Sequence, residues 1–133
     1  MTLQVRRALT AQPVSPAQAR AIVRRTLGLW DGDGVRVAEL LTSELVTNAV
    51  RHAATKIVLR VALEANTVRV EVSDLDTAMP ALREAPDIGG YGLRIVDRLA
   101  ARWGVVVIPD GGKTVWFELD LAGREADRRE AIR

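Results

Sequence analysis

The stretch "SELVTNAVRH", residues 43–52, has the pattern of a buried helix, because apolar residues recur through it and it contains neither glycine nor proline. On a helical wheel at about 100° per residue, the apolar side chains from residue 37 onward cover an arc of roughly 180°. That arc is formed by Val37, Leu40, Leu41, Leu45 and Ala49. Glu44 and Asn48 fall near its middle, one turn apart, and His52 follows one turn later. We therefore expect these polar side chains to point toward the core or a cleft.

Two interpretations of this polar pair follow from the sequence. A buried carboxylate must find partners or give up its charge, so the pair is either satisfied within the core or lines a pocket whose ligand supplies the partners. An acid and an amide four residues apart suit a hydrated magnesium ion. Asn48 offers a neutral oxygen, and Glu44 can orient or deprotonate a nearby hydroxyl or water. The spacing alone leaves both interpretations open.

The order of predicted elements favours an α+β fold. Strands are expected at residues 3–9, 56–64, 67–74, 103–110 and 113–121, and helices at residues 15–28, 35–52 and 92–102. The first helix is expected to begin with Ser15 as a capping hydroxyl and Pro16 at the first helical position. Because hairpins alternate with helices, the economical packing is a two-layer α/β sandwich, with a mostly antiparallel mixed sheet and the helices on one face.

Composition narrows the functional classes. The chain of 133 residues fits one domain, which we assign to residues 1–122, followed by a charged C-terminal tail at residues 123–133. With no cysteine and one histidine, the sequence predicts neither disulfides nor a zinc site, and this favours a cytoplasmic protein. No apolar run approaches the roughly 18 residues of a membrane span. The net charge is only +2 and the basic residues are scattered, so direct binding to nucleic acid is not expected.

Two further stretches bear on a ligand site. Asp74 ends a predicted strand beside residues 75–91, a long loop of the kind that is usually functional or mobile. Asp74 could equally be an ordinary surface turn residue. "IGGYGL", residues 88–93, places three glycines immediately before a predicted helix, where free backbone amides suit a phosphate. The alternative is a flexible connection, because glycine-rich loops are common.

Taken in order, these stretches resemble the nucleotide-binding boxes of the GHKL (Bergerat-fold) ATPases, and among them the small bacterial anti-sigma-factor serine/threonine kinases. "SELVTNAVRHA" is similar to their N box, "VRVEVSD" to the first glycine box, "GGYGLRIVDRLA" to the second, and "GGKTVWFEL" to the terminal strand motif. The similarity covers most of residues 15–121. Each motif alone is weak, whereas four in order form a strong signal.

The resemblance implies a role for each matching residue. Glu44 would be the general base of phosphoryl transfer, and Asn48 would coordinate Mg²⁺. Asp74 would accept the amino group of adenine, with Thr114 joining through a shared water. Residues 75–91 would form a lid over the nucleotide. The phosphates of ATP would be held by backbone amides at the start of the next helix, those of Gly90, Gly92 and Leu93. His52 matches a histidine often found in these kinases, without an assigned role.

The resemblance also implies partners. Family members commonly dimerise, sequester a sigma factor and phosphorylate an anti-anti-sigma antagonist on serine or threonine, which releases that antagonist.

One departure from the family pattern matters. Where the family often has glycines after the box aspartate, this chain has Asp76 and Ala78, and Asp76 adds negative charge near an anionic ligand. The alternative function is therefore a protein-binding regulator of the same fold that works by sequestration without phosphoryl transfer.

Overall fold

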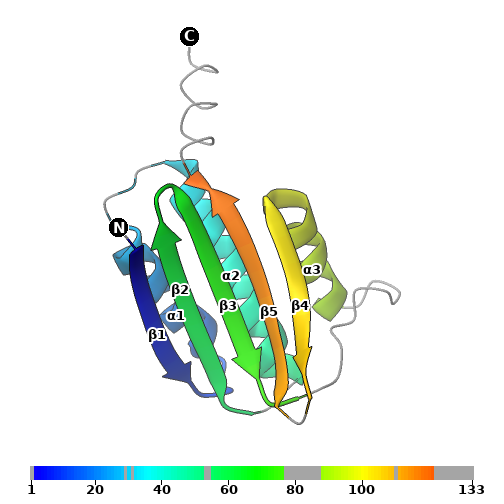
Figure 1. Cartoon of the computed structure of the whole chain (residues 1–133). Helices are drawn as coiled ribbons and strands as arrows, with labels where there is room; N and C mark the ends of the chain where they lie inside the picture. The colour runs from blue at the N-terminus through cyan, green and yellow to red at the C-terminus, as the bar shows by residue number, and fades with distance from the viewer. Residues whose placement is uncertain are drawn as a thin grey trace.

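Five strands form one sheet, as the computed structural model shows (Figure 1). It describes residues 2–28, 30, 32–52, 55–76, 88–109 and 111–121, with only the backbone for 88–92. The strands are β1 (Thr2–Leu9), β2 (Ile57–Glu64), β3 (Thr67–Asp74), β4 (Arg102–Ile108) and β5 (Gly112–Asp120). Their order across the sheet is β1-β2-β3-β5-β4. Every pair of neighbours in this described sheet is antiparallel, so the sheet is antiparallel rather than mixed.

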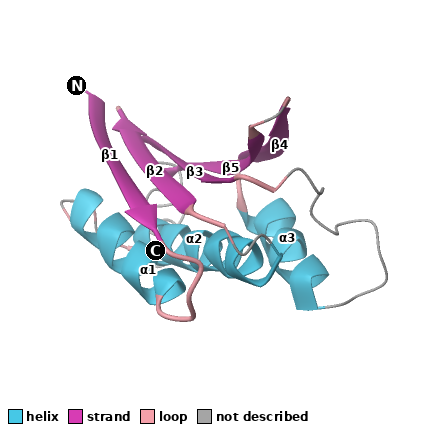
Figure 2. Ribbon diagram, turned by 90° about the horizontal axis from the view of Figure 1, so that it is seen from below, coloured by secondary structure: helices cyan, strands magenta, loops and turns pink. Residues whose placement is uncertain are grey.

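Three helices cover one face of the sheet and leave the other open (Figure 2). They are α1 (Ser15–Thr26), α2 (Asp33–His52) and α3 (Ile88–Leu99). This arrangement confirms the expected two-layer α+β sandwich with its helices on one face. Within the described residues, none of the helices combines the length and the apolar character that crossing a membrane requires. The tail expected at residues 123–133 lies outside the described part of the chain.

The core lies between the helices and the covered face of the sheet. Alternate residues of β3 and β5 point into it, because side chains of a strand point to opposite faces in turn. Its largest fully buried side chains include Phe117 from β5, Ile57 and Leu59 from β2, Leu41 from α2 and Leu93 from α3. The apolar alternation seen in the sequence therefore sets which strand face meets the helices.

Two details of the helix starts differ from the sequence expectations. Ser15 is the first residue of α1 rather than its N-cap, and its side chain makes no cap bond. The hydroxyl instead donates to the carbonyl oxygen of Thr10, which ties the helix start to the end of β1. The third helix begins at Ile88, four residues earlier than the expected 92. The glycines at 89, 90 and 92 therefore lie within the helix rather than in front of it.

Candidate nucleotide site

The polar residues of α2 lie at the margin of its buried face. Glu44 and Asn48 are half-buried, and Leu40, one turn before Glu44, is 41% exposed. The prediction that Leu40 belongs to the core, and that the polar pair lies at the middle of the apolar arc, is therefore wrong. The buried face of α2 is turned away from this stripe and is formed by Gly34, Ala38, Leu41, Thr42, Leu45, Val46 and Ala49.

Contacts between helices explain this rotation of α2. The flank of α2 opposite the polar stripe faces α1, where Arg20 donates to the hydroxyl of Ser43 at 2.8 Å. Arg24 bonds the carboxylate of Glu39 on the same flank at 2.6 Å. Because α2 lies between α1 and α3 (Figure 2), the stripe of Glu44 and Asn48 is on the side away from α1. Glu44 and Asn48 are thus neither fully exposed nor fully buried, so a ligand can reach their side chains.

Several candidate elements meet at one end of the molecule. Figure 1 shows the C-terminal part of α2, the end of β3 and the start of β5 at this end. A hydrogen bond joins the segment after α2 to the end of β3, from the backbone N–H of Leu75 to the hydroxyl of Thr55 at 3.2 Å. The fold thus brings Asn48 and Asp74 to the same end. His52 also lies there, exposed on the last turn of α2.

Asp74 is buried on the helix side of the sheet and is 4% exposed. Its Oδ1 accepts two bonds, from the Nζ of Lys113 at 3.1 Å and from the backbone N–H of Asp76 at 2.8 Å. Lys113 also donates to the carbonyl oxygen of Asp76 at 3.1 Å. Asp74 is therefore not an ordinary surface turn residue, since a buried carboxylate is held in a fixed orientation by an ammonium group and an amide.

Thr114 lies on the other face of the sheet from Asp74. It is paired in register with Ser73, and the two hydroxyl oxygens are 2.7 Å apart on the open face. The residue opposite Asp74 is Lys113. The structure therefore does not bring the side chains of Thr114 and Asp74 together, and the sequence analysis missed Lys113. A signal was present, because Lys113 is in phase with the apolar residues at 115, 117 and 119 of the same strand.

The phosphate-binding amides expected near the start of α3 are only partly available. In an α-helix the first four N–H groups lack partners within the helix, while later ones bond the carbonyl four residues before. Gly90 is among those first residues, but Gly92 and Leu93 lie beyond them. The side chain of Leu93 is buried in the core at 1% exposure. Of the expected lid, residues 77–87 lie outside the described part of the chain.

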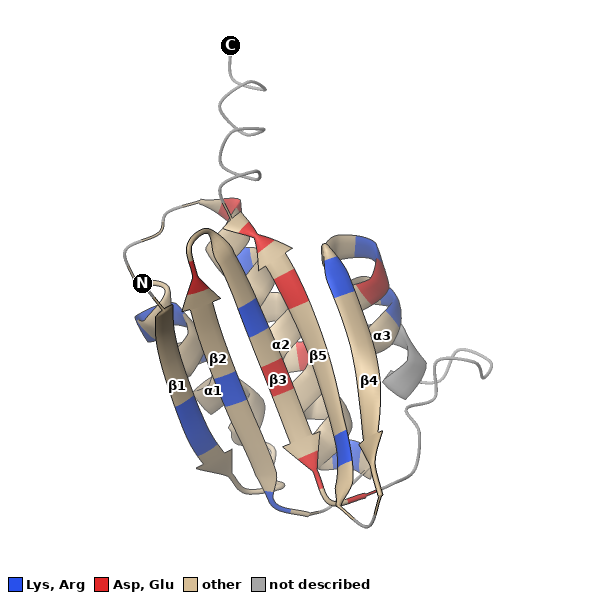
Figure 3. Cartoon of the chain, in the orientation of Figure 1, with Lys and Arg blue, Asp and Glu red and all other residues tan. Residues whose placement is uncertain are grey.

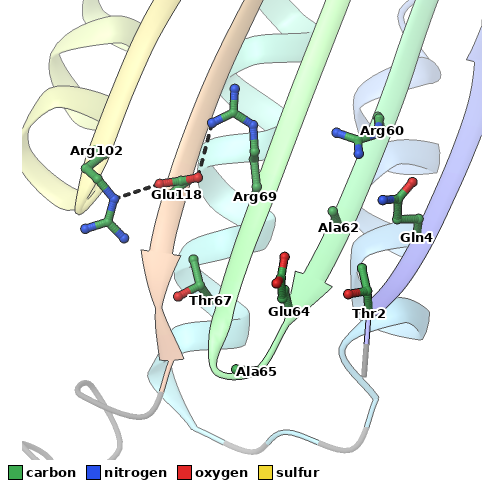
Figure 4. A pocket seen from close by; sticks show the side chains of 10 residues that line it. All are labelled: Thr2, Gln4, Arg60, Ala62, Glu64, Ala65, Thr67, Arg69, Arg102 and Glu118. Atoms are coloured by element: carbon green, nitrogen blue, oxygen red, sulfur yellow. Dashed lines mark hydrogen bonds and ion pairs between the residues drawn. The ribbon is translucent and has the colours of Figure 1, made fainter.

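The open face of the sheet carries a second, different cluster. Basic and acidic residues occupy neighbouring strands there (Figure 3), and their side chains form ion pairs across the strands. A hollow of about 490 Å³ lies above them (Figure 4). It is lined by Thr2, Gln4, Arg60, Ala62, Glu64, Ala65, Thr67, Arg69, Arg102 and Glu118. The three arginines of this hollow are each ion-paired, with Glu71, Glu118 and Asp120 as their partners. Because these charges neutralise one another, the hollow does not suit a triphosphate.

These ion pairs lower the pKa of two acids in the cluster, Glu118 and Asp120. The hydrogen bond from Arg102 is the main reason that the pKa of Glu118 lies below its ordinary value, with partial burial opposing the shift and Arg69 adding to it. The bond from Arg102 likewise lowers the pKa of Asp120. Arg69 also lies over the ring of Trp116, 4.1 Å from its centre. The open face is thus a network of fixed charges, separate from the end of the molecule that holds Asp74.

The residues at that end fit a nucleotide better than a metal bound by protein alone. Among the described residues, no three acidic or histidine side chains gather into a metal cluster. Asn48 offers a neutral amide oxygen, and oxygen is the ligand type that a magnesium ion takes in addition to its waters and the phosphates it binds. Asp74 offers an acceptor for an amino group in the same region, since its Oδ2 has no partner among the described residues.

Comparison with known families decides what this arrangement belongs to. The sequence model of the histidine kinase-like ATPase domain matches residues 9–119. The chain belongs to this family. Membership implies ATP binding, and it accounts for the antiparallel sheet covered by helices on one face. The match runs from the end of β1 to the end of β5, so it includes every element of the candidate site.

Solved structures of other proteins share this fold. The RsbU and RsbW domains of Rv1364c from Mycobacterium tuberculosis superpose with a TM-score of 0.69 at 23% identity, over 90% of this chain and 32% of that one. The histidine kinase domain of the Erythrobacter litoralis EL346 blue-light activated histidine kinase superposes with a TM-score of 0.58 at 20% identity, over 85% of this chain and 62% of that one. This chain therefore spans less than two thirds of either protein. No curated protein matches it.

Proposed function

We propose that the chain is an ATP-dependent protein kinase of the anti-sigma-factor type, which transfers the γ-phosphoryl group to a serine or threonine of a protein partner. The observation that carries this proposal is the half-buried pair Glu44 and Asn48 on α2, a helix whose C-terminal part lies at the same end of the molecule as the buried Asp74. Family membership supplies ATP as the nucleotide. Similarity to a structure that contains an RsbW domain supports the anti-sigma type.

Each of these residues has a distinct role in the proposed reaction. Asn48 would hold Mg²⁺ through its side-chain oxygen, and Asp74 would accept a hydrogen bond from the amino group of adenine. The metal, when bound, supplies charge neutralisation of the triphosphate. Glu44 takes the proton from the attacking hydroxyl as general base. The free amides at the start of α3, including that of Gly90, hold phosphate oxygens at the positive end of the helix dipole.

The proposed partners are proteins. A sigma factor is sequestered, and an anti-anti-sigma antagonist is the phosphorylated substrate, in the cytoplasm and with a homodimer as the working state. The open face of the sheet supports a role without direct nucleic-acid contact, because its arginines at 60, 69 and 102 are paired with carboxylates. Arg and Lys side chains bind nucleic acid by neutralising phosphate charge, and here the carboxylates already neutralise these arginines.

A second candidate function rests on a specific observation. Asp76 stands where the family often has glycine, and its backbone is bound to both Asp74 and Lys113. This compact arrangement fills the neighbourhood of the nucleotide-binding carboxylate with the chain's own groups. The alternative is therefore a regulator that sequesters its partner with little or no phosphoryl transfer.

Calorimetric titration with ATP, with and without Mg²⁺, tests the nucleotide site. We expect binding that depends on Mg²⁺, and a loss of this dependence in Asn48→Ala, because the metal loses its protein ligand. Thr47→Ala is the matched control, since residue 47 neighbours Asn48 on α2 but points away from the buried face. Absence of binding by the wild type at millimolar ATP would overturn the proposal and favour sequestration.

A second experiment tests catalysis. Glu44→Gln keeps the size and polarity of the side chain but cannot act as a base. We expect unchanged ATP affinity and a rate of phosphoryl transfer reduced roughly 100-fold or more. The readout is transfer of label from γ-labelled ATP to the protein that co-purifies with the wild-type chain. Equal rates for the variant and the wild type would remove Glu44 from the role of base.

A further inference from the structure

Lys113 is a buried lysine in a strand whose other inward residues are apolar. It lies at the start of β5 and is 5% exposed, in phase with Val115, Phe117 and Leu119. A buried ammonium group is costly unless it is paired and hydrogen-bonded. A structural role alone would be served by an apolar residue, which would continue the alternation of the strand. The position of Lys113 opposite Asp74 therefore calls for a chemical explanation.

In the pair of Lys113 and Asp74, one hydrogen-bond donor and one acceptor have no partner among the described residues. An ammonium group has three donors and no acceptor. Two of these donors go to Oδ1 of Asp74 and to the carbonyl oxygen of Asp76, both at 3.1 Å. Oδ1 also accepts the backbone N–H of Asp76. Among the described residues, neither the third N–H of Lys113 nor Oδ2 of Asp74 has a partner.

An adjacent acceptor and donor match one edge of adenine. That edge presents the exocyclic amino group, a donor, next to the ring nitrogen N1, an acceptor. We propose that Lys113 reads the base of the bound nucleotide, donating its third N–H to N1 while Oδ2 of Asp74 accepts from the amino group. This inference rests on the proposed function, because it assigns the base-binding half of the same site.

The assignment has a consequence for specificity. Guanine and hypoxanthine carry a hydrogen on N1 and an oxygen at position 6, so they would present a donor to Lys113 and an acceptor to Asp74. If a water molecule contacted N1 in place of Lys113, it could rotate to accept a hydrogen bond from N1–H. An ammonium group cannot accept a hydrogen bond. A base that leaves two buried polar groups unpaired is rejected strongly. Lys113 thus makes the site selective for adenine.

The test compares three nucleotides by calorimetry in the presence of Mg²⁺: ATP, 1-deaza-ATP, in which a C–H group replaces N1, and ITP. For the wild type we expect 1-deaza-ATP to bind roughly tenfold or more weakly than ATP, the effect of losing a hydrogen bond from a charged donor. ITP is expected to bind more weakly still. This comparison uses the unaltered chain, so it does not depend on the folding of a variant.

Lys113→Met and Lys113→Gln then separate base reading from a structural role. We expect the preference for ATP over 1-deaza-ATP to fall to about onefold in the methionine variant and to be partly restored by glutamine, which keeps an N–H donor. If Lys113 only stabilises Asp74, both nucleotides weaken equally and the preference survives, which would overturn the inference. Equal binding of ATP and 1-deaza-ATP by the wild type would overturn this inference and leave the proposed function standing. No binding of any nucleotide would overturn the proposed function as well.

Discussion

Gly112 begins β5 where the backbone of this strand passes closest to the end of β3. Its φ is +90°, and a Cβ at this position would lie 1.9 Å from the carbonyl oxygen of Asp74. Glycine is thus required both for its backbone conformation and for the space, because other residues are strained at positive φ. This close approach is one residue away from Lys113, which stands opposite Asp74, so Gly112 borders the proposed base-reading pair.

Gly112→Ala should therefore weaken both the fold and the site. We expect the free energy of unfolding to fall by about 2 kcal/mol or more, from positive-φ strain plus the clash with backbone atoms. Gly111→Ala is the matched control, because a Cβ there meets the Cγ2 of Ile108, a methyl of an exposed side chain that can move. Urea unfolding of the two variants measures the difference. Equal stability of both would contradict the steric argument.

Thr42 of α2 places a hydroxyl group in the apolar core. The residue is fully buried, and its Oγ1 has no hydrogen-bond partner among the described residues. An unsatisfied buried hydroxyl costs roughly 1–3 kcal/mol. We expect Thr42→Val, which replaces the hydroxyl with a methyl of similar size, to raise the free energy of unfolding by about 1 kcal/mol.

A comparison within α1 makes this test specific. Thr26→Val removes a hydroxyl that is satisfied, since Thr26 Oγ1 donates to the carbonyl oxygen of Ile22 at 2.8 Å. That variant should be neutral or slightly destabilised. Thermal or urea unfolding of the two variants measures how the loss of each hydroxyl changes the free energy of unfolding. A stabilised Thr26→Val beside a destabilised Thr42→Val would show that hydroxyl satisfaction is not what separates them.

At the scale of elements, the open face of the sheet couples stability to pH. Because Arg102 and Arg69 hold the pKa of Glu118 below its ordinary 4.5, the folded state binds that proton less readily than the unfolded chain. Glu118 therefore contributes stability that is fully present above pH 4.5 and is lost as the pH falls through its lowered pKa. Asp120 acts in the same direction, because its pKa is also lowered by Arg102.

Glu118→Gln should therefore cost stability near neutral pH and cost progressively less as the pH falls below 4.5. Urea midpoints of the variant and the wild type, measured between pH 7 and pH 3, give the difference. Salt at about 1 M screens exposed charges and should shrink the neutral-pH difference. A difference that stayed constant with pH would mean that the ion pairs of Glu118 do not carry its contribution.

Most elements were predictable from the sequence because their signals are local. Alternation identified the strands, and the long helix α2 contains neither glycine nor proline from Val35 to His52. The rotation of α2 was not predictable, because packing against α1 turns Leu40 outward despite its apolar side chain. The partner of Asp74 was also missed: the alternation along β5 places Lys113 on the buried face, but which residue of β5 stands opposite Asp74 depends on the register between two strands that are distant in the sequence. Register shifts of one residue exchange the two faces.

At the scale of the whole molecule, Leu121 closes the end of the sheet opposite the candidate site. It is 2% exposed, and its backbone N–H donates to the carbonyl oxygen of Asn66 at 2.8 Å. A Cβ on Gly34, at the start of α2, would lie 2.7 Å from the Cδ2 of Leu121. Leu121 thus links the β2–β3 hairpin to the start of α2, through its backbone hydrogen bond to Asn66 and its side-chain packing at Gly34.

The proposed domain boundary after residue 122 can be tested by comparing two altered proteins. Leu121→Ala should lower the free energy of unfolding by about 2–4 kcal/mol, the cost of removing a buried leucine side chain. Ending the chain after residue 122, by contrast, should leave both stability and Mg²⁺-dependent ATP binding unchanged, because residues 123–133 are proposed to form a tail outside the domain. Urea unfolding and calorimetry of the two proteins provide the comparison. A shortened chain as unstable as Leu121→Ala would place the boundary of the folded unit beyond residue 122, since the removed segment would then contribute contacts as strong as those of a core leucine.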